Sequence, residues 1–379
     1  MCKIWVGKRE SDILTYNYFD YSITFYGSNV GNNKSFCIQH RINSSYSQDY
    51  ISFILKNLKE ILSDKKNYEI HFYNNVLAYK VVNLFPEIEK YIVNLNALSV
   101  LNSLRHKTLS RLWLCNCIDT PAFCLLSKKE CTISNLKKKF GSQYTSFVIQ
   151  KNYSAGGTGT YLMCDNNQYE IADKLDEIEL YLASPFYHPN QSYSCHAMID
   201  NEKCVIFPIS RQNFYTENNK LEYIGNTYID IHSKLSVNIK NSATKICKKL
   251  QSIGYRGICG FDFISTNHRI LLVEINPRYQ GSSFVINASL HDNRLPSLFE
   301  LNNMCFTNGI PNEFAFRIEN LKIKYYNSSL NYQNASDIKK AKYIIDSSEN
   351  IIFLDGFLSA KSFEKGSYLL RYISPCEEF

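Results

Sequence analysis

The sequence predicts a mixed protein with α/β and α+β parts and more than one domain. The chain has 379 residues, of which 45% are hydrophobic, so it can bury several cores. Its first hundred residues alternate between β-rich runs and helical periodicity, which is typical of a parallel α/β sheet. Later segments read as strand pairs joined by turns, with helices between them, which is typical of an α+β arrangement.

Residues 1–100 predict a small α/β domain with a mainly parallel sheet. Short runs of β-forming residues predict strands over 2–6, 22–26, 68–73 and 91–94. The clearest helix is expected over 46–64, where Tyr50, Ile54 and Leu58 recur at helical spacing. No GxGxxG motif lies near the first strand, so a dinucleotide site there is not supported.

The middle of the chain predicts a helix followed by a series of strands. The helix is expected from about 96 to 117, and Pro121 excludes its continuation. A strand, a glycine turn and a second strand are expected over 140–164, and further strands over 177–210.

A second amphipathic helix is expected over 234–253, with Gly254 as its C-terminal stop. Its apolar side is expected to hold Val237, Ile246, Leu250 and Ile253. Two strands follow this helix, and the last seventy residues predict short strands and turns in a small β-rich unit.

Charge and cysteine content restrict the partners and the compartment. The formal net charge of +7 is mild for this length; it suits an anionic ligand and does not indicate nucleic acid. The first ten residues carry charges where a signal peptide needs an apolar run, and no window approaches the ~20 apolar residues of a membrane span. The thirteen cysteines are odd in number and lack zinc-type spacing, so we expect reduced thiols in a cytoplasmic protein.

Residues 146–163 hold a glycine-rich turn between two apolar strands. Gly156, Gly157 and Gly159 remove side chains where a backbone could approach phosphate oxygens and offer them N–H groups. Lys151 ends the first strand and could place its ammonium against the same phosphates. The alternative is an ordinary long hairpin with a mobile tip. The pattern GxxxxGK[ST] is absent, so the turn is not a P-loop.

Residues 257–283 predict a β-hairpin that carries two opposed acids. If the hairpin closes symmetrically about residue 268, Asp262 lies opposite Glu274, and Asn276 projects from the same face. Two carboxylates at cross-strand distance repel each other, so this oxygen set suits Mg²⁺, with Mn²⁺ as an alternative. The competing interpretation is that one acid faces solvent or forms a structural ion pair with Arg278.

The order of these motifs resembles the ATP-grasp superfamily, especially its carboxylate–amine ligases and biotin-carboxylase-like members. The resemblance covers roughly residues 100–285. In that family a lysine precedes a glycine-rich hairpin, as Lys151 precedes SAGGTG here, and an acidic strand pair ends in a D/E…E-x-N-x-R pattern. Two further matches are LRHKTLSRLWLCNCIDTP, with Lys107 at the phosphate-binding position, and IELYLASP, with Glu179 at the adenine position.

The resemblance implies a binding site for ATP and magnesium. The nucleotide would contact Lys107, Lys151, Ser154, Gly156, Gly157, Glu179 and backbone groups of Leu180 and Leu182. The cation would be held by Asp262, Glu274 and Asn276. The implied fold is an ATP-grasp fold with an N-terminal pre-grasp domain over 1–100, an ATP-grasp domain over 101–310 with its lid at about 120–180, and a small C-terminal β-rich domain over 311–379.

The resemblance also implies the reaction. A substrate carboxylate attacks the γ-phosphate of ATP, which gives an acylphosphate and ADP, and an amine then displaces phosphate. Arg278 would hold the carboxylate or the acylphosphate; Arg211, at the end of another strand, is a second candidate, or else a solvated cation. The chain lacks a biotin-attachment motif and the HVEIQ-type strand of biotin carboxylases, which favours amide or peptide bond formation by an amino-acid ligase.

Two other functions stay open on the sequence alone. A related enzyme would load an amino acid onto the thiol of an acidic carrier protein, and the net charge of +7 is compatible with that partner. A nucleotide-binding module without turnover is the second, and the intact acid–acid–amide set argues against it. We expect small-molecule carboxylate and amine substrates, and the resemblance adds the option of a homodimer.

Overall fold

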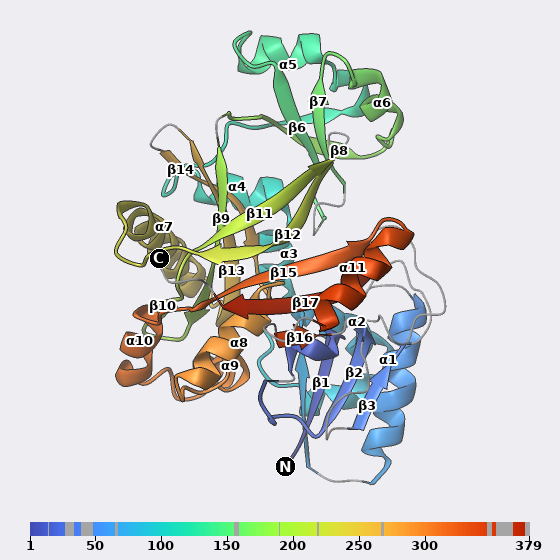
Figure 1. Ribbon diagram of the computed structural model, residues 1–379, viewed down its shortest axis with the longest axis vertical. Coiled ribbons are helices and arrows are strands. Elements are labelled where there is room, and N and C mark those ends of the chain that lie inside the picture. Colours follow the sequence, from blue (N-terminus) through green and yellow to red (C-terminus); the bar gives the residue numbers. More distant parts are fainter. Residues whose placement is uncertain are drawn as a thin grey trace.

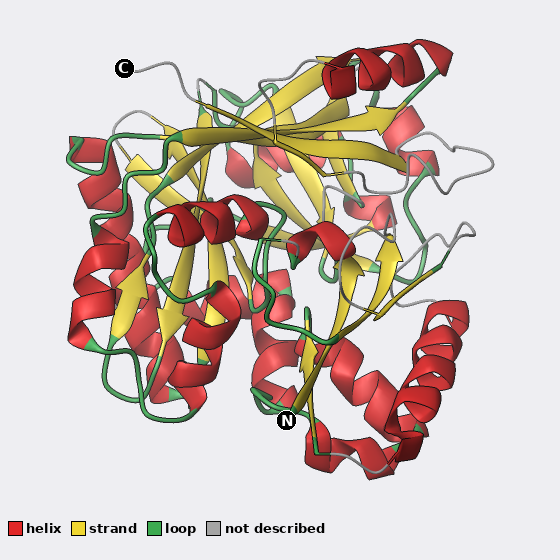
Figure 2. Ribbon diagram, turned by 60° about the horizontal axis from the view of Figure 1, so that its bottom comes forward, coloured by secondary structure: helices red, strands yellow, loops and turns green. Residues whose placement is uncertain are grey.

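The chain forms three β-sheets with helices packed against them. The computed structural model describes residues 1–13, 15–26, 34–38, 48–64, 67–154, 159–188, 190–217, 220–266, 269–346, 351–353 and 367–375. From the bottom to the top of Figure 1, the sheets are an N-terminal sheet (β1–β4), a central sheet (β9–β17) and a lid sheet (β5–β8). Figure 2 shows the strands of the central sheet in the middle of the molecule with helices against them.

The N-terminal sheet is entirely parallel in the described residues, in the order β3-β2-β1-β4. Its elements are β1 (Cys2–Arg9), β2 (Tyr21–Tyr26), β3 (Lys34–Cys37), α1 (Gln48–Ile61), β4 (Tyr68–Phe72) and α2 (Asn75–Leu84). Their apolar faces form one core around Ile4, Ile70, Tyr50 and Leu58. The parallel sheet and the helix over 46–64 that the sequence predicts are confirmed.

The strand predicted over 91–94 is wrong. Residues Pro86–Tyr91 form a 3-10 helix, and only Ile92 pairs with the sheet, through a single bridge to Ile70. Asn94 then has a φ of 63°, which takes the chain out of the extended conformation. The sequence also gave no sign of β3, which is four residues long.

The helix predicted over 96–117 is two helices, α3 (Leu98–Arg105) and α4 (Lys107–Leu114). His106 separates them because its backbone is extended, with a ψ of 105°. Its imidazole Nδ1 accepts a hydrogen bond from the Leu109 N–H at 3.3 Å and so caps the first turn of α4. The break starts α4 at Lys107, and the Lys107 N–H donates to the Asn152 carbonyl at 3.2 Å.

The lid sheet is antiparallel, in the order β5-β8-β6-β7. Its strands and helices are β5 (Cys124–Ser127), α5 (Ile133–Phe140), β6 (Ser146–Lys151), β7 (Thr160–Cys164), α6 (Gln168–Asp173) and β8 (Leu180–Pro185). Leu126, Phe147 and Tyr181 are fully buried in its core. The hairpin predicted over 140–164 is confirmed, with Gln150 opposite Thr160.

The central sheet has the order β14-β13-β9-β11-β12-β15-β17-β16, and β10 pairs with β9. Its strands are β9 (Gln191–Ile199), β10 (Cys204–Ile206), β11 (Ser210–Glu217), β12 (Lys220–Tyr228), β13 (Gly257–Thr266), β14 (Arg269–Asn276), β15 (Tyr325–Tyr332), β16 (Ile351–Phe353) and β17 (Ser367–Pro375). The helices beside it are α7 (Lys234–Ser252), α8 (Ser283–Asp292), α9 (Leu298–Phe306), α10 (Asn312–Glu319) and α11 (Ala335–Asp346). The C-terminal strands extend this sheet through the pairing of β12 with β15. The domain boundaries at 100 and 310 stay predictions.

Helix α7 confirms the prediction over 234–253, and Gly254 follows it with a φ of 81°. Its buried side differs from the predicted one. Ile246 and Leu250 are fully buried, but Val237 is 44% and Ile253 38% exposed. Ile239 and Ala243 take their place because α7 packs against β9 and β10.

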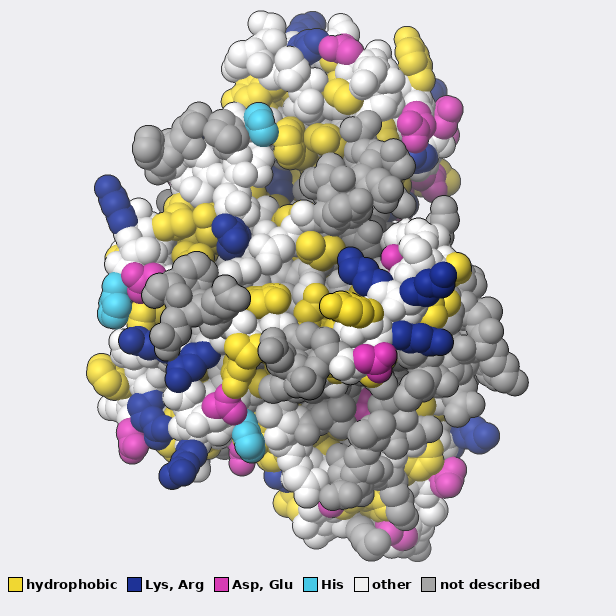
Figure 3. Space-filling view, in the orientation of Figure 1, with side chains coloured by type: hydrophobic (Ala, Val, Ile, Leu, Met, Phe, Trp, Pro, Cys, Tyr) yellow, Lys and Arg dark blue, Asp and Glu magenta, His cyan; other side chains and the backbone are white. Residues whose placement is uncertain are grey.

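The surface carries charges of both signs. In the face drawn in Figure 3, a group of Lys and Arg side chains lies over α11, where Lys339, Lys340 and Lys342 are exposed. Among the helices of the described ranges, none combines the length and the hydropathy that crossing a bilayer requires. The acidic carrier protein and the homodimer stay predictions.

Candidate functional site

The hairpin of β13 and β14 places Asp262 directly opposite Glu274, as the sequence predicts. The reason differs from the predicted symmetric closure about residue 268. Thr266 pairs with Arg269, and the same register runs to the pair of Phe263 and Leu272. A β-bulge then leaves Val273 without an opposite residue and advances the register by one. Without this bulge, Asp262 would face Val273 instead of Glu274.

Arg111 on α4 holds the bulged segment. Its Nε and Nη2 donate to the Val273 carbonyl at 3.3 and 3.2 Å. It also donates to Ser184 Oγ at 2.9 Å and to Gln150 Oε1 at 3.2 Å, which lie on lid strands β8 and β6. Burial lowers the pKa of Arg111 to about 10, so the side chain stays cationic at neutral pH. Sequence reasoning missed Arg111; its only signal is a position one helical turn after Lys107.

Asp262 lies among neutral donors and next to another acid. It accepts hydrogen bonds from Asn276 Nδ2 at 2.8 Å and from Gln212 Nε2 at 3.1 Å. Burial and the negative charge of Glu274 raise the pKa of Asp262 to about 6. Glu274 itself accepts from Lys107 Nζ at 3.1 Å, and this lysine is only 3% exposed. Gln212 is a second contact that the sequence did not reveal.

The side-chain oxygens of Asp262, Glu274 and Asn276 are of the kind that binds a hard divalent cation. Burial and the facing charge of Glu274 both disfavour the ionised form of Asp262, and a bound cation would offset that effect. Within the described part of the chain, no three His, Cys, Asp or Glu side chains cluster as metal ligands. Asp262 and Glu274 would therefore share the cation with the Asn276 amide and non-protein oxygens, which is how Mg²⁺ is usually held. The Asn276 oxygen accepts from Arg278 Nη2 at 3.0 Å here, so it would exchange that partner on ligating.

Lys107 connects the acids to the glycine-rich turn. Besides Glu274, its Nζ donates to the Ser154 carbonyl at 2.9 Å and to Ser154 Oγ at 3.2 Å. Asn152, just after β6, accepts from the Thr108 hydroxyl at 2.7 Å and from the Thr108 N–H at 3.3 Å. The turn is thus docked on the N-terminal end of α4, where helix N–H groups favour anions. Asn152 is another contact that sequence reasoning missed.

The remaining residues predicted to bind the nucleotide lie along the lid sheet. Lys151 and Glu179 form an ion pair at 2.9 Å, which raises the pKa of Lys151. Leu180 is exposed and its carbonyl accepts from Asn152 Nδ2 at 3.1 Å, whereas Leu182 is buried and paired on both sides within the sheet. Gly156 and Gly157 lie outside the described residues.

Gly159, the third glycine of the turn, has a backbone conformation that favours glycine. Gly159 has a φ of 71°, and its carbonyl accepts from the Lys151 N–H at 2.9 Å. A Cβ at this position would lie 3.0 Å from the Lys151 side chain. The glycine therefore lets the hairpin close against the stem of Lys151.

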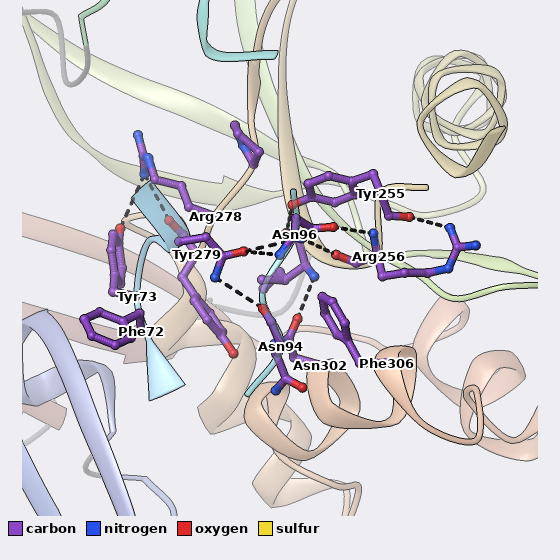
Figure 4. A pocket seen from close by; sticks show the side chains of 13 residues that line it. Phe72, Tyr73, Asn94, Asn96, Tyr255, Arg256, Arg278, Tyr279, Asn302 and Phe306 are labelled. Carbon is purple, nitrogen blue, oxygen red and sulfur yellow. Dashed lines mark hydrogen bonds between the residues drawn. The ribbon is translucent and has the colours of Figure 1, made fainter. Parts of the chain in front are cut away.

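The structure brings Arg278, but not Arg211, to the acids. Arg278 donates to Asn276, to the Tyr279 carbonyl at 3.0 Å and to the Tyr73 hydroxyl at 3.4 Å, as Figure 4 shows for the last two. On β11 it is Gln212 that contacts Asp262, and successive strand residues project to opposite faces. Arg211 is exposed and lies on the other face, so its predicted catalytic role has no support from this geometry.

A small cavity lies beside Arg278 and Tyr73 (Figure 4). Two of the asparagine side chains that line it are already hydrogen-bonded to the backbone. Asn96 exchanges two hydrogen bonds of 2.8 Å with the backbone of Arg256, and Asn302 accepts from the Ile258 N–H at 2.8 Å. We therefore interpret this cavity as part of the seam between the N-terminal and central sheets.

Comparison with known proteins agrees with this geometry. Residues 106–282 match the family model described as an ATP-grasp domain. This range contains the lid sheet, the hairpin of β13 and β14, Lys107 and Arg278. No curated protein sequence matches the chain significantly.

Solved structures of similar fold cover nearly the whole chain. N5-carboxyaminoimidazole synthetase from Staphylococcus aureus, crystallised with ADP, is 14% identical with a TM-score of 0.67, over 100% of this chain and 94% of that one. The Aspergillus clavatus N5-carboxyaminoimidazole synthase in complex with ADP and 5-aminoimidazole ribonucleotide is 12% identical with a TM-score of 0.65 (99% and 94%). The L-amino acid ligase from Bacillus licheniformis is 8% identical with a TM-score of 0.61 (100% and 94%). The chain therefore has the ATP-grasp fold, and its residues 106–282 match the ATP-grasp domain of that family model.

Proposed function

We propose that this protein is an ATP- and Mg²⁺-dependent ligase that activates a carboxylate as an acylphosphate and joins it to an amine, with release of ADP and phosphate. One observation carries the proposal. A continuous chain of contacts runs from Ser154 through Lys107 to Glu274, and across the hairpin to Asp262. It continues through Asn276 to Arg278. The groups that we propose to bind phosphate, cation and carboxylate are thus contiguous.

The nucleotide phosphates would lie between the glycine-rich turn and α4. Lys107 is buried beside the turn, and Lys151 ends the strand that leads into it. Both lysines are held by acids, Glu274 and Glu179 respectively. Phosphate oxygens would replace these carboxylates as partners, and Glu179 would then be available to the adenine amino group. The exposed Leu180 edge is a better adenine contact than Leu182, whose backbone is paired within the sheet.

Transfer of the γ-phosphoryl group depends mainly on positioning and on compensation of charge. A cation held by Asp262, Glu274 and Asn276 would supply charge neutralisation between neighbouring phosphates. Arg111 fixes the bulge that sets the two carboxylates opposite each other. Arg278, two residues beyond Asn276, would orient the attacking carboxylate.

The choice of an amine as acceptor rests on two supports. The chain lacks the biotin-attachment motif and the HVEIQ-type strand noted above. One protein of similar fold is named an L-amino acid ligase, and another was crystallised with an amino-imidazole ribonucleotide. Both names are compatible with C–N bond formation, and the substrates of this chain are the open part of the proposal.

A coupled ADP-release screen over pairs of amino acids and small amines tests the proposal. We expect release that requires both an acid and an amine, and its loss in Glu274→Gln. Glu87→Gln, an exposed acid on the 3-10 helix Pro86–Tyr91, is the matched control and should keep wild-type activity. Full activity of Glu274→Gln would refute the cation assignment. ADP release that depends on a carrier protein, but not on an amine, would favour thiol loading instead.

A further inference from the structure

Neutral polar side chains surround the carboxylate of Asp262. Gln212 reaches across β9 from β11, and its Nε2 donates to Asp262 Oδ1 at 3.1 Å. Asn276 donates to the other oxygen, Oδ2, at 2.8 Å. Ser194 on β9 lies directly opposite Asp262 in the β9–β13 pair. Opposite residues of neighbouring strands project to the same face with Cβ atoms ~4.5–5.5 Å apart, so the Ser194 hydroxyl lies beside the carboxylate.

A second glutamine, Gln280, lies behind Ser194. It belongs to the segment between β14 and α8, and its Nε2 donates to Ser194 Oγ at 3.3 Å. A serine oxygen that accepts from an amide directs its own proton elsewhere, and Asp262 is the acceptor opposite it. Burial and the charge of Glu274 raise the pKa of Asp262, and a hydrogen bond from the Ser194 hydroxyl lowers it. Gln280 therefore acts on Asp262 through Ser194.

The fold reserves a fixed place for the Gln280 side chain. Gly260 faces it, and a Cβ on this glycine would lie 1.9 Å from Gln280 Cδ. The Gln280 N–H donates to Ser283 Oγ at 2.9 Å, and this hydroxyl lies 3.0 Å from His196 Nε2. Burial lowers the pKa of His196 to about 3, so the imidazole is neutral and adds no charge near the acids. The Gln280 amide is thus held over the β9–β13 pair.

Stability does not explain an amide at position 280. The side chain is 7% exposed, and its Oε1 is buried without a hydrogen-bond partner among the described residues. An unpaired buried acceptor costs more than the single bond from Nε2 returns. Methionine has a similar shape and would lack both the bond and the unpaired acceptor. The amide therefore points to a role at the neighbouring acid.

Neutral donors orient a carboxylate without competing for its charge. An arginine or a lysine paired with Asp262 would neutralise the charge that attracts a cation. Amide and hydroxyl donors fix the directions of the carboxylate lone pairs and leave the negative charge for the metal. Loss of a group that hydrogen-bonds to a metal ligand commonly lowers metal affinity roughly ten- to hundredfold.

We propose that Gln212 and Gln280 are positioning residues that orient the Asp262 carboxylate for the divalent cation, Gln212 by direct donation and Gln280 through the Ser194 hydroxyl. This proposal rests on the cation site of the proposed ligase. It assigns neither glutamine a contact with the cation or with a substrate.

Manganese binding in the absence of turnover tests the proposal. Mn²⁺ is titrated into the intact chain without nucleotide, and the electron paramagnetic resonance signal of free Mn²⁺ gives the dissociation constant. We expect Gln212→Met and Gln280→Met each to raise this constant roughly tenfold, because a carboxylate that loses a donor samples more orientations. Asp262→Asn should raise it further. Gln143→Met, at an exposed position between α5 and β6, is the matched control and should bind like the wild type.

Two measurements separate positioning from a general loss of structure. The midpoint of urea denaturation of Gln280→Met should stay close to that of the wild type, since the variant loses one bond and one unpaired acceptor together. Ser194→Ala should weaken Mn²⁺ binding about as much as Gln280→Met does. The double variant should bind no more weakly than either single variant, because Gln280 acts through the Ser194 hydroxyl.

Wild-type Mn²⁺ affinity in either glutamine variant would overturn the proposal, and so would losses that add up in the double variant of Gln280 and Ser194. The Asp262→Asn arm judges the cation site separately. If Asp262→Asn loses Mn²⁺ and a glutamine variant keeps it, the cation site stands and the positioning role fails. If Asp262→Asn binds like the wild type, the cation site of the proposed ligase is wrong, and the positioning role fails with it.

Discussion

Replacement of Asp262 by Asn should stabilise the protein in the absence of a divalent cation. Burial and the charge of Glu274 raise the pKa of Asp262 from 3.8 to about 6, so its ionised form is disfavoured in the fold. Asn has nearly the same shape and can accept the hydrogen bond from Asn276, while the Gln212 amide can rotate to match it. The substitution therefore removes a charge while it keeps the local packing.

The magnitude follows from the pKa shift. A rise of about two units at 1.36 kcal/mol each gives a destabilisation of about 3 kcal/mol once Asp262 is ionised. Because the folded-state pKa is above the unfolded one, this group stabilises the fold fully below pH 3.8 and loses that contribution as the pH rises through about 6. The advantage of Asp262→Asn should be about 3 kcal/mol at pH 8 and roughly half of that at pH 5.

Urea denaturation of the wild type and Asp262→Asn between pH 5 and 8 measures this difference, with and without Mg²⁺. Titrating groups that do not interact with Asp262 cancel in the difference between the two proteins. Saturating Mg²⁺ should stabilise the wild type, by about 2.7 kcal/mol at a hundredfold excess over the dissociation constant, and should leave the variant nearly unchanged. Asp173→Asn, an exposed acid at the end of α6, is the matched control and should differ little from the wild type.

Two results would contradict this reasoning. A stability difference that does not change with pH would mean that Asp262 does not titrate near 6. Equal stabilisation of both proteins by Mg²⁺ would mean that the cation binds elsewhere, and the proposed cation site would then be wrong.

Three further outcomes are expected. Arg111→Met removes the donors to Val273, Gln150 and Ser184, so urea denaturation should show a free energy of unfolding lower by about 3 kcal/mol. An unchanged free energy of unfolding would exclude the bridging role of Arg111. Lys151→Ala should weaken ATP binding in calorimetry and leave the circular dichroism melt intact; unchanged nucleotide affinity would remove Lys151 from the site. Asn152→Ala should lower the free energy of unfolding by about 1 kcal/mol, since Thr108 in the first turn of α4 loses its hydrogen-bond acceptor. It should also raise the KM for ATP. Wild-type values for both quantities would show that the glycine-rich turn does not depend on this contact.

The elements predicted best are those whose signal is local. Helix α7 and the strands of both hairpins follow from periodicity, and the pairing of Asp262 with Glu274 was predicted correctly. That pairing nevertheless depends on the bulge at Val273, which no local pattern indicated. The predicted strand over 91–94 failed because apolar residues there pack without pairing, apart from the bridge at Ile92.

Contacts between residues far apart in the sequence could not be predicted from it. Arg111 joins α4 to three strands, and Asn152 joins α4 to the glycine-rich turn. Arg371 lies 359 residues from its partner Asp12. No spacing rule connects residues so far apart, because their proximity results from how whole sheets pack together.

The sequence alone determined the chemical inventory of this protein: a lysine before a glycine-rich turn, two acids with an amide and an arginine at strand spacing, and the order of these motifs along the chain. Strand alternation and hairpin pairing are local properties, so they can be read without coordinates. Only the tertiary structure decided which side chains share one volume of space. It placed Arg278 beside Asn276, revealed Arg111 as the link between the lid sheet and the hairpin, and brought Asp12 and Arg371 together. The relative placement of sheets is set by packing summed over the whole chain, which no local pattern contains.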